Sequence, residues 1–167
     1  VGIQICWDMS YDDGWETLAR KGAELVVWTT QSPGRIKTAC RALRHGYFVV
    51  TSTWRNNASL MDPTGHVIGS VTPEDGEEVF VEEIDLAYVI LPWQPELRNG
   101  EALREAYGEK VGFRYSEAED SGIFWSNDPA TPILEMVRKL GLRYGPGKTE
   151  EDRRLQDAAR GGPPSLE

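Results

Sequence analysis

The sequence predicts an α/β fold for the N-terminal part of the chain, because strand-like and helical patterns alternate over about the first fifty residues. Short apolar runs predict strands at residues 1–5, 24–29 and 47–54. Helical patterns lie between them, over residues 14–21 and from Ser32 onward. Such alternation is typical of α/β proteins, in which helices cover a sheet.

Residues that favour helix ends support both predicted helices. Asp12 or Asp13 is expected to cap the first helix and to give it an acidic first turn, and Gly22 ends it. Ser32 is expected to cap the second helix. Pro33 would then occupy the first helical position, where its missing N–H has no intrahelical role.

The second predicted helix carries one apolar stripe. Ile36, Cys40 and Leu43 recur at i, i+4 and i+7, with Ala39 beside them. A stripe of this kind normally faces the core, so we expect Cys40 to be a small core residue.

A hairpin is predicted after the third strand. Residues 58–61 and 66–71 have strand character, and the Asp-Pro-Thr-Gly sequence at 62–65 is typical of a turn. Residues 79–84 are expected to form one more strand. We assign residues 1–91 to one domain.

The sequence changes character after about residue 91, and we predict a packed C-terminal extension over residues 92–142. Residues 91–98 contain prolines and are expected to be irregular, and residues 112–128 have no clear period. Large aromatic residues indicate a packed unit rather than a loose linker: Trp93, Phe113, Tyr115, Phe124 and Trp125. Residues 143–167 are charged, rich in Gly and Pro and nearly devoid of apolar residues, so we expect a disordered tail.

Two helices are expected inside the extension. Asn99 is expected to cap a helix that runs through Tyr107. Thr131-Pro132 is expected to begin a second, short helix that ends at Leu140-Gly141.

The composition is that of a soluble globular protein, with 40% hydrophobic and 27% charged residues among 167. No apolar run approaches the roughly 20 residues that a membrane-spanning helix needs. Residues 1–60 carry seven basic and five acidic groups, whereas residues 61–167 carry eleven and twenty-two, for a net charge of −9. This balance argues against nucleic acid or an anionic membrane as a partner. Two cysteines make a poor disulfide framework, so we expect a reducing cytoplasm.

The residue with the clearest chemical potential is Cys6, which directly follows the first predicted strand. A turn-rich segment and then a helix come after it. A sharp turn at the end of a strand displays a nucleophile, and the following backbone N–H groups face a bound carbonyl oxygen. Cys6 is therefore the candidate nucleophile.

The segment around Cys6 resembles the nucleophile segment of the nitrilase (carbon–nitrogen hydrolase) superfamily. The family has a strand ending in Cys-x-Asp, then a helix, then Leu-Ala-x-x-Gly-Ala-Glu. The matching residues in this chain are Cys6, Asp8, Leu18, Ala19, Gly22, Ala23 and Glu24. Further blocks follow in the family's order, with Arg41-Ala42 before the third strand and SLMDPTG over residues 59–65. The resemblance covers roughly residues 1–90, and its finer character is closest to the amidases and carbamoylases.

The sequence departs from the family's pattern at two places near the pocket. The family's Phe-Pro-Glu after the cysteine is replaced by Tyr11, Asp12 and Asp13. The Arg-Ala pair is followed by Leu43-Arg44-His45 where the family has x-Glu-Asn, so the charge is reversed at Arg44.

The resemblance implies a thiol-dependent hydrolase of non-peptide C–N bonds. In the family a Glu takes the thiol proton, and a Lys stabilises the oxyanion together with the backbone N–H after the cysteine, here that of Trp7. The family's Glu and Lys lie in an N-terminal half, which we expect to precede Val1 in a longer product or to be on another chain. An amide, carbamoyl compound or nitrile would then form a thioester on Cys6 and be hydrolysed to an acid.

Other polar residues near Cys6 have simpler explanations. Glu16, Lys21 and Lys37 are expected on exposed helix faces, and Glu24 at the start of a strand. Asp8 is expected to shape the turn around Cys6 rather than to shuttle protons.

Residues at the ends of neighbouring strands are candidates for lining the substrate pocket. Trp28, Thr29, Thr30 and Gln31 follow one another at the end of the second strand, and Trp7 follows Cys6. The histidines, His45 and His66, have no second metal ligand at a useful spacing, so we expect neither a metal site nor a cofactor.

The resemblance also implies an architecture. Members of the family form a four-layer α-β-β-α sandwich from two similar halves, with mixed sheets, and often dimerise. We expect this chain to form one half of that sandwich plus the C-terminal extension. Its open sheet face would be covered by a second copy or by the other half. The alternative is a catalytically incomplete fragment that acts as an interaction or structural module.

Overall fold

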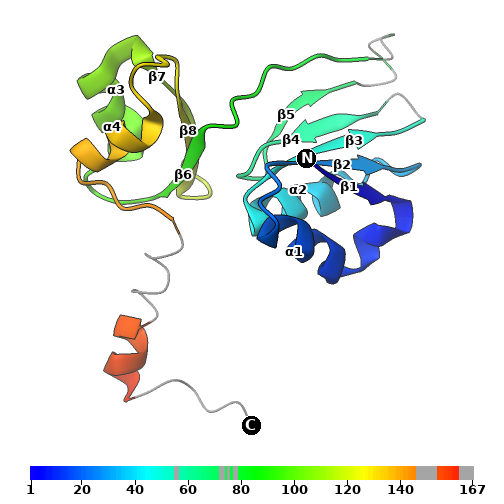
Figure 1. The fold of residues 1–167 in the computed structure, drawn as a ribbon, viewed down its shortest axis with the longest axis horizontal. Helices are drawn as coiled ribbons and strands as arrows, with labels where there is room; N and C mark the ends of the chain where they lie inside the picture. Colours follow the sequence, from blue (N-terminus) through cyan, green and yellow to red (C-terminus); the bar gives the residue numbers. More distant parts are fainter. Residues whose placement is uncertain (55–56, 72–73, 75, 77–78, 146–153, 162–167) are drawn as a thin grey trace. The chain divides into compact units, whose positions relative to one another are not determined.

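A five-stranded mixed sheet organises the first of two compact units, Val1–Leu86 and Ala87–Glu167 (Figure 1). The computed structural model describes residues 1–54, 57–71, 74, 76, 79–145 and 154–161. In the first unit the elements are β1 (Gly2–Ile5), η1 (Cys6–Ser10), α1 (Asp12–Arg20), β2 (Leu25–Thr29), α2 (Arg35–His45), β3 (Phe48–Ser52), β4 (Ser59–Met61) and β5 (Val67–Ser70).

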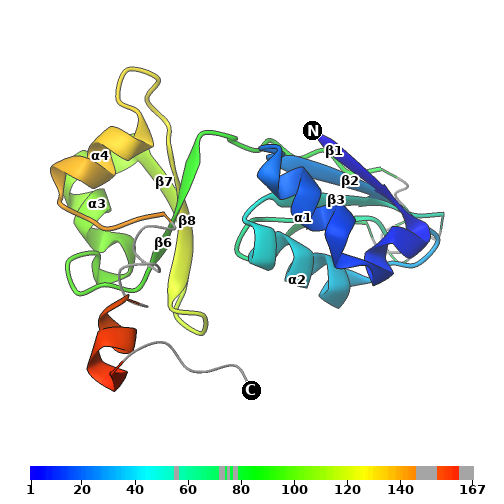
Figure 2. The same ribbon diagram turned by 60° about the horizontal axis from the view of Figure 1, so that its bottom comes forward.

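The sheet has the order β1-β2-β3-β4-β5, in which β1, β2 and β3 are parallel and β4 and β5 are antiparallel. Each parallel step is a strand–helix–strand crossover, and β4 and β5 form the predicted hairpin. Both helices lie on the same face of the sheet (Figure 2). The core between helices and sheet consists of Met9, Trp15, Val26, Trp28, Ala42, Tyr47, Val49 and Met61.

The opposite face of this sheet carries apolar side chains that no helix in the described part of the first unit covers. Strand β1 alternates between buried and exposed residues, and Ile3 and Ile5 are 65% and 60% exposed. Residues 79–84 were predicted as a strand, but they form no sheet pairing. All of them except Glu83 line a groove of about 470 Å³ together with Val50 and Leu60, so this segment lies across a sheet face instead of extending its edge.

Helix α2 differs from its prediction at both its start and its buried face. It begins at Arg35, and Gly34 with φ +47° occupies the N-cap in place of Ser32, because a left-handed residue interrupts the helix there. The buried side chains of α2 are Thr38 and Ala42. The predicted stripe points outward, and Cys40 is exposed, so its assignment to the core was wrong.

The first turn of α1 is acidic as predicted, with Asp12 and Asp13 in it, but its cap differs from the prediction. Tyr11 is the N-cap, and neither Asp12 nor Asp13 caps the helix. The Asp12 carboxylate instead forms ion pairs with Arg41 and Arg44 of α2. These ion pairs connect α1 to α2, and the Asp12 carboxylate is then no longer available to cap its own helix.

The second unit is a three-stranded antiparallel sheet of order β6-β8-β7, with helices packed on one face (Figure 1). Its elements are β6 (Tyr88–Pro92), η3 (Arg98–Gly100), α3 (Glu101–Tyr107), η4 (Gly108–Lys110), β7 (Val111–Ser116), β8 (Ser121–Ser126) and α4 (Ile133–Lys139). The core of this unit includes Leu91, Leu97, Leu103, Phe124, Ile133, Met136 and Val137.

Several boundaries in the second unit differ from those expected. Strand β6 spans Tyr88–Pro92, and the two compact units divide just before it, between Leu86 and Ala87. The segment without a clear period, 112–128, contains the β7–β8 hairpin. Gly100, with φ +104°, caps α3 in place of Asn99. In the expected tail, residues 154–160 are helical, whereas 146–153 and 162–167 lie outside the described residues.

Candidate active site

The carboxyl ends of the three parallel strands meet at one edge of the first sheet, where Cys6 lies. Ile5 of β1 pairs with Thr29 of β2, and Thr29 pairs with Ser52 of β3. The chain beyond β2 stays attached to this edge, because the Thr30 N–H donates to the Ser52 carbonyl at 3.0 Å. In parallel α/β sheets this edge is where ligands bind.

Cys6 has the geometry of a displayed nucleophile. Its φ is +43°, a left-handed conformation that side chains other than glycine adopt at a cost of about 1–2 kcal/mol. The thiol is free and the residue is exposed. Conformations of this kind persist where the surrounding structure enforces them, and they concentrate at functional sites.

The side chain of Asp8 helps to enforce this turn. Its carboxylate accepts the N–H of Ile5 at 2.9 Å, across the turn that contains Cys6. Its carbonyl accepts the N–H of Tyr11 at 3.2 Å. Asp8 thus makes the contacts expected of a residue that shapes the turn.

Two buried indoles and one half-buried guanidinium donate hydrogen bonds to carbonyl groups of η1. Trp28 donates its indole N–H to the Cys6 carbonyl at 3.1 Å, and Trp15 donates to the Asp8 carbonyl at 3.0 Å. Arg41 donates to the Met9 carbonyl at 3.0 Å, and its guanidinium also lies 5.5 Å from the centre of the Trp15 ring. Sequence reasoning missed these roles for Trp15 and Arg41. The Arg41-Ala42 block of the family indicated that Arg41 matters. The sequence could not show that Arg41 binds the Met9 carbonyl.

The residues predicted to line the pocket divide into two groups. Trp7 is 71% exposed, and Thr29 and Gln31 are exposed at the edge near Cys6. Trp28 is only 2% exposed and lies on the helix-covered face, so its indole contacts the backbone. The Thr30 hydroxyl accepts the Ser32 N–H at 3.1 Å and so helps to shape the loop after β2.

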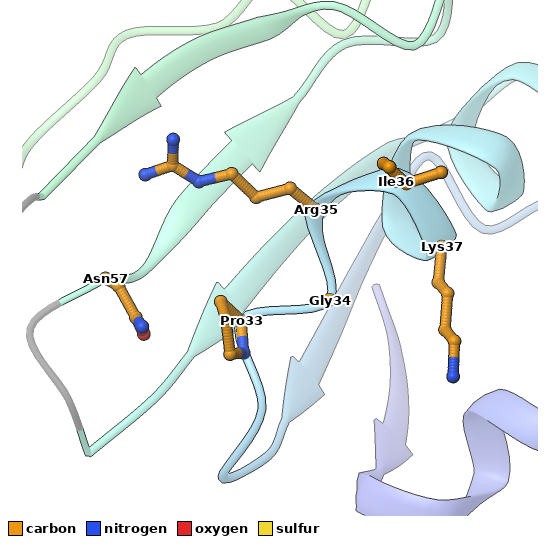
Figure 3. Close-up of a pocket in the computed structure, with 6 residues that line it drawn as sticks. All are labelled: Pro33, Gly34, Arg35, Ile36, Lys37 and Asn57. Atoms are coloured by element: carbon orange, nitrogen blue, oxygen red, sulfur yellow. The ribbon is translucent and has the colours of Figure 1, made fainter.

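A pocket of about 510 Å³ opens beside the start of α2. It is lined by Pro33, Gly34, Arg35, Ile36, Lys37 and Asn57. Figure 3 shows the Arg35 side chain extending toward the side of Asn57, whereas Lys37 extends in another direction. Within the described ranges, neither cation forms an ion pair, so this pocket carries positive charge.

The remaining polar candidates have ordinary surface or structural roles. Glu16 lies 3.9 Å from Arg20 on the surface of α1, and Glu24 is exposed. The pKa of Asp12 is lowered, first by the hydrogen bond from Arg41 and then by the charge of that guanidinium.

The histidines also have local environments that differ from a metal site. Burial, followed by repulsion from Arg41 and Arg44, lowers the pKa of His45, whose ring stacks on Tyr47 at 5.4 Å. The His66 ring lies 3.0 Å from the Thr64 hydroxyl in the hairpin turn. Across the part of the chain that the structure describes, no group of three His, Cys, Asp or Glu residues is placed to hold a metal ion.

Comparison with known proteins decides the family. Residues 1–91, more than half of the chain, match the carbon–nitrogen hydrolase family. The chain belongs to that family. The resemblance predicted from the segment around Cys6 is therefore confirmed, and so is the α/β fold with a mixed sheet. The first unit has one sheet and one helix layer, which corresponds to half of the family's four-layer sandwich.

Solved structures of the nitrilase superfamily are also similar to this carbon–nitrogen hydrolase chain. Saccharomyces cerevisiae Nit3, a member of branch 10 of that superfamily, is 23% identical, with 42% of this chain and 32% of that chain covered and a TM-score of 0.39. A mutant of a Nesterenkonia AN1 amidase is 19% identical, with 41% and 32% covered and a TM-score of 0.37. The matched part thus spans about a third of either structure. No curated protein sequence matches the chain.

No helix among the described segments is both long and apolar enough to cross a bilayer.

Proposed function

We propose that this chain supplies the nucleophile of a thiol-dependent hydrolase that cleaves non-peptide C–N bonds in amides, carbamoyl compounds or nitriles. The observation that carries the proposal is Cys6, an exposed thiol held with φ +43° at the end of β1 in a carbon–nitrogen hydrolase. Strain at an exposed cysteine is difficult to explain by packing alone, since the side chain contributes nothing to the core.

The reaction follows from the chemistry of the thiol. The Cys6 sulfur adds to the carbonyl carbon of an amide, and the Trp7 N–H stabilises the oxyanion that forms. The C–N bond then breaks, the nitrogen leaves as ammonia or an amine with the thiol proton, and a thioester remains on Cys6. Water hydrolyses the thioester to a carboxylic acid and the free thiol. A nitrile takes up one further water molecule before ammonia leaves.

Two further groups are part of the proposal. We infer that a Glu acts as general base and a Lys as oxyanion partner, both contributed by the other half of the sandwich. The exposed apolar side chains of Ile3 and Ile5 support a partner at the open sheet face, either the other half or a second copy. The same exposed face is what favours the alternative, a non-catalytic interaction module.

The test measures ammonia release from representative amides, carbamoyl compounds and nitriles, using the chain alone and within its complete reading frame. Cys6→Ala should abolish turnover, and Cys40→Ala, which removes the other exposed cysteine, should retain it. Intact-mass spectrometry should detect an acyl adduct that Cys6→Ala removes. Turnover that survives Cys6→Ala would refute the assignment of the nucleophile. Absence of both turnover and adduct in the complete protein would favour the interaction module.

A further inference from the structure

The peptide bond between Cys6 and Trp7 is held from its buried side by a single indole. Trp28 donates its Nε1–H to the Cys6 carbonyl at 3.1 Å. Trp15 and Arg41 hold the carbonyls of Asp8 and Met9 in the same short helix. Of these three donors, only Trp28 contacts the peptide whose N–H is the proposed oxyanion donor.

Trp28 is itself firmly placed. It lies in the centre of a parallel strand triplet, paired with Gln4 on one side and Thr51 on the other, and is 2% exposed. The far end of its ring lies against Gly34, where a Cβ atom would come within 2.8 Å of the ring. The ring therefore has no room to shift toward Gly34 without moving the start of α2.

Because the peptide unit is rigid, holding the Cys6 carbonyl also fixes the direction of the Trp7 N–H. A peptide unit is planar and trans, so its C=O and N–H groups point in opposite directions. When the Cys6 carbonyl is directed at the buried indole, the Trp7 N–H must point away from it. Donation to the carbonyl also polarises the amide and makes its N–H a stronger donor.

We propose that Trp28 is a positioning residue, which fixes the Cys6–Trp7 peptide plane so that the Trp7 N–H stabilises the oxyanion formed at Cys6. This inference rests on the proposed function. The part played by Trp28 is indirect, because its side chain is buried and acts through the backbone of Cys6.

The test compares two reactions of the Cys6 thiol in the full chain with Cys40→Ser as background, because both cysteines are exposed. Acylation by p-nitrophenyl acetate passes through a tetrahedral oxyanion: the S–C bond forms, p-nitrophenolate leaves and a thioester remains. Alkylation by iodoacetamide displaces iodide directly and forms no oxyanion. Thiol exposure and basicity affect both rates, whereas oxyanion stabilisation affects only the acylation. The ratio of the acylation rate to the alkylation rate therefore reports on oxyanion stabilisation.

Trp28→Phe keeps a buried ring but removes the N–H, and Trp15→Phe is the matched control, since it removes an equally buried indole donor from the Asp8 carbonyl. Loss of an oxyanion donor costs about 100-fold or more, so a donor that is only misoriented should cost about tenfold. We expect Trp28→Phe to lower acylation about tenfold with alkylation unchanged, and Trp15→Phe to leave the ratio unchanged.

Equal loss in both reactions, no loss in acylation, or an equal effect of Trp15→Phe would overturn the inference. If Trp28→Phe does not fold by circular dichroism, Gly34→Ala takes its place, because it displaces the ring and retains the N–H; an unchanged ratio there would also overturn it. Since the ratio is measured with small reagents, it remains decisive even if no amide, carbamoyl compound or nitrile is hydrolysed. Failure of the proposed function is thus distinguishable from failure of the inference.

Discussion

The contact between Gly34 and Trp28 makes a quantitative prediction for Gly34→Ala. A side chain at φ +47° costs about 1–2 kcal/mol because of its left-handed backbone. The new Cβ would also lie 2.8 and 2.9 Å from two carbons of the Trp28 ring, closer than Cβ atoms approach other atoms. Overpacking of this kind costs about 1–3 kcal/mol. The reduced entropy of the unfolded chain offsets about 0.4–1 kcal/mol, so the net loss of stability should be about 1–4.6 kcal/mol.

Gly22→Ala is the matched control for this prediction. Gly22 also has a positive φ, +76°, but a Cβ there meets nothing within 4 Å. It should therefore lose only about 1 kcal/mol, the backbone strain less the entropy gain.

The assay is urea denaturation of the full chain followed by tryptophan fluorescence. Four of the six tryptophans lie in the first unit, so the signal reports mainly on the sheet that carries Cys6. If Gly34→Ala costs no more than Gly22→Ala, the ring is not tightly held, and the reasoning about Trp28 fails.

Three further predictions concern the core and the titratable groups. Phe124→Ala should cost about 3–5 kcal/mol, because the ring is fully buried, and faster hydrogen exchange should be confined to Ala87–Glu167; spread into Val1–Leu86 would contradict the division into two units. Burial lowers the pKa of His45 below its ordinary 6.5, so the unfolded chain takes up the proton first and stability falls as the pH drops below 6.5. In His45→Phe the urea midpoint should therefore fall less steeply as the pH drops below 6.5. An unchanged slope would contradict the lowered pKa of His45. Because Arg41 lowers the pKa of Asp12, that carboxylate stabilises the fold above its ordinary 3.8 and loses this effect at lower pH. Asp12→Asn should therefore reduce the acid-induced drop in the urea midpoint, and a drop as steep as that of the unsubstituted chain would contradict the ion pair.

Local patterns predicted much of the first unit because its strands and turns depend on near neighbours in the chain. The apolar runs now seen as β2 and β3 and the Asp-Pro-Thr-Gly turn lie where they were expected. The extended segment at 79–84 shows the limit of this reasoning. Its residues have strand propensity, but a strand also needs a partner edge, and this segment lies across a face instead.

The prediction that the apolar stripe of α2 faces the core was wrong for a similar reason. Ile36 and Leu43 are spaced for a buried face, yet Thr38 and Ala42 are the residues that α2 buries. Small side chains suit the close approach of a helix to a sheet. The Thr38 hydroxyl is satisfied within its own helix, by the carbonyls of Gly34 and Arg35, so its burial leaves no unpaired polar group.

The sequence by itself determined the identity of the candidate nucleophile, the family and the order of strands and helices around Cys6. These depend on residue types at short spacings, which are visible along the chain. Only the tertiary structure decided how the peptide after Cys6 is held, since its anchor, Trp28, is 22 residues away and comes from a neighbouring strand. Trp15 and Arg41 reach the same short helix from two other elements. A hydrogen bond between distant residues leaves no periodic trace in a sequence, because it depends on the register of parallel strands and the packing of helices upon them.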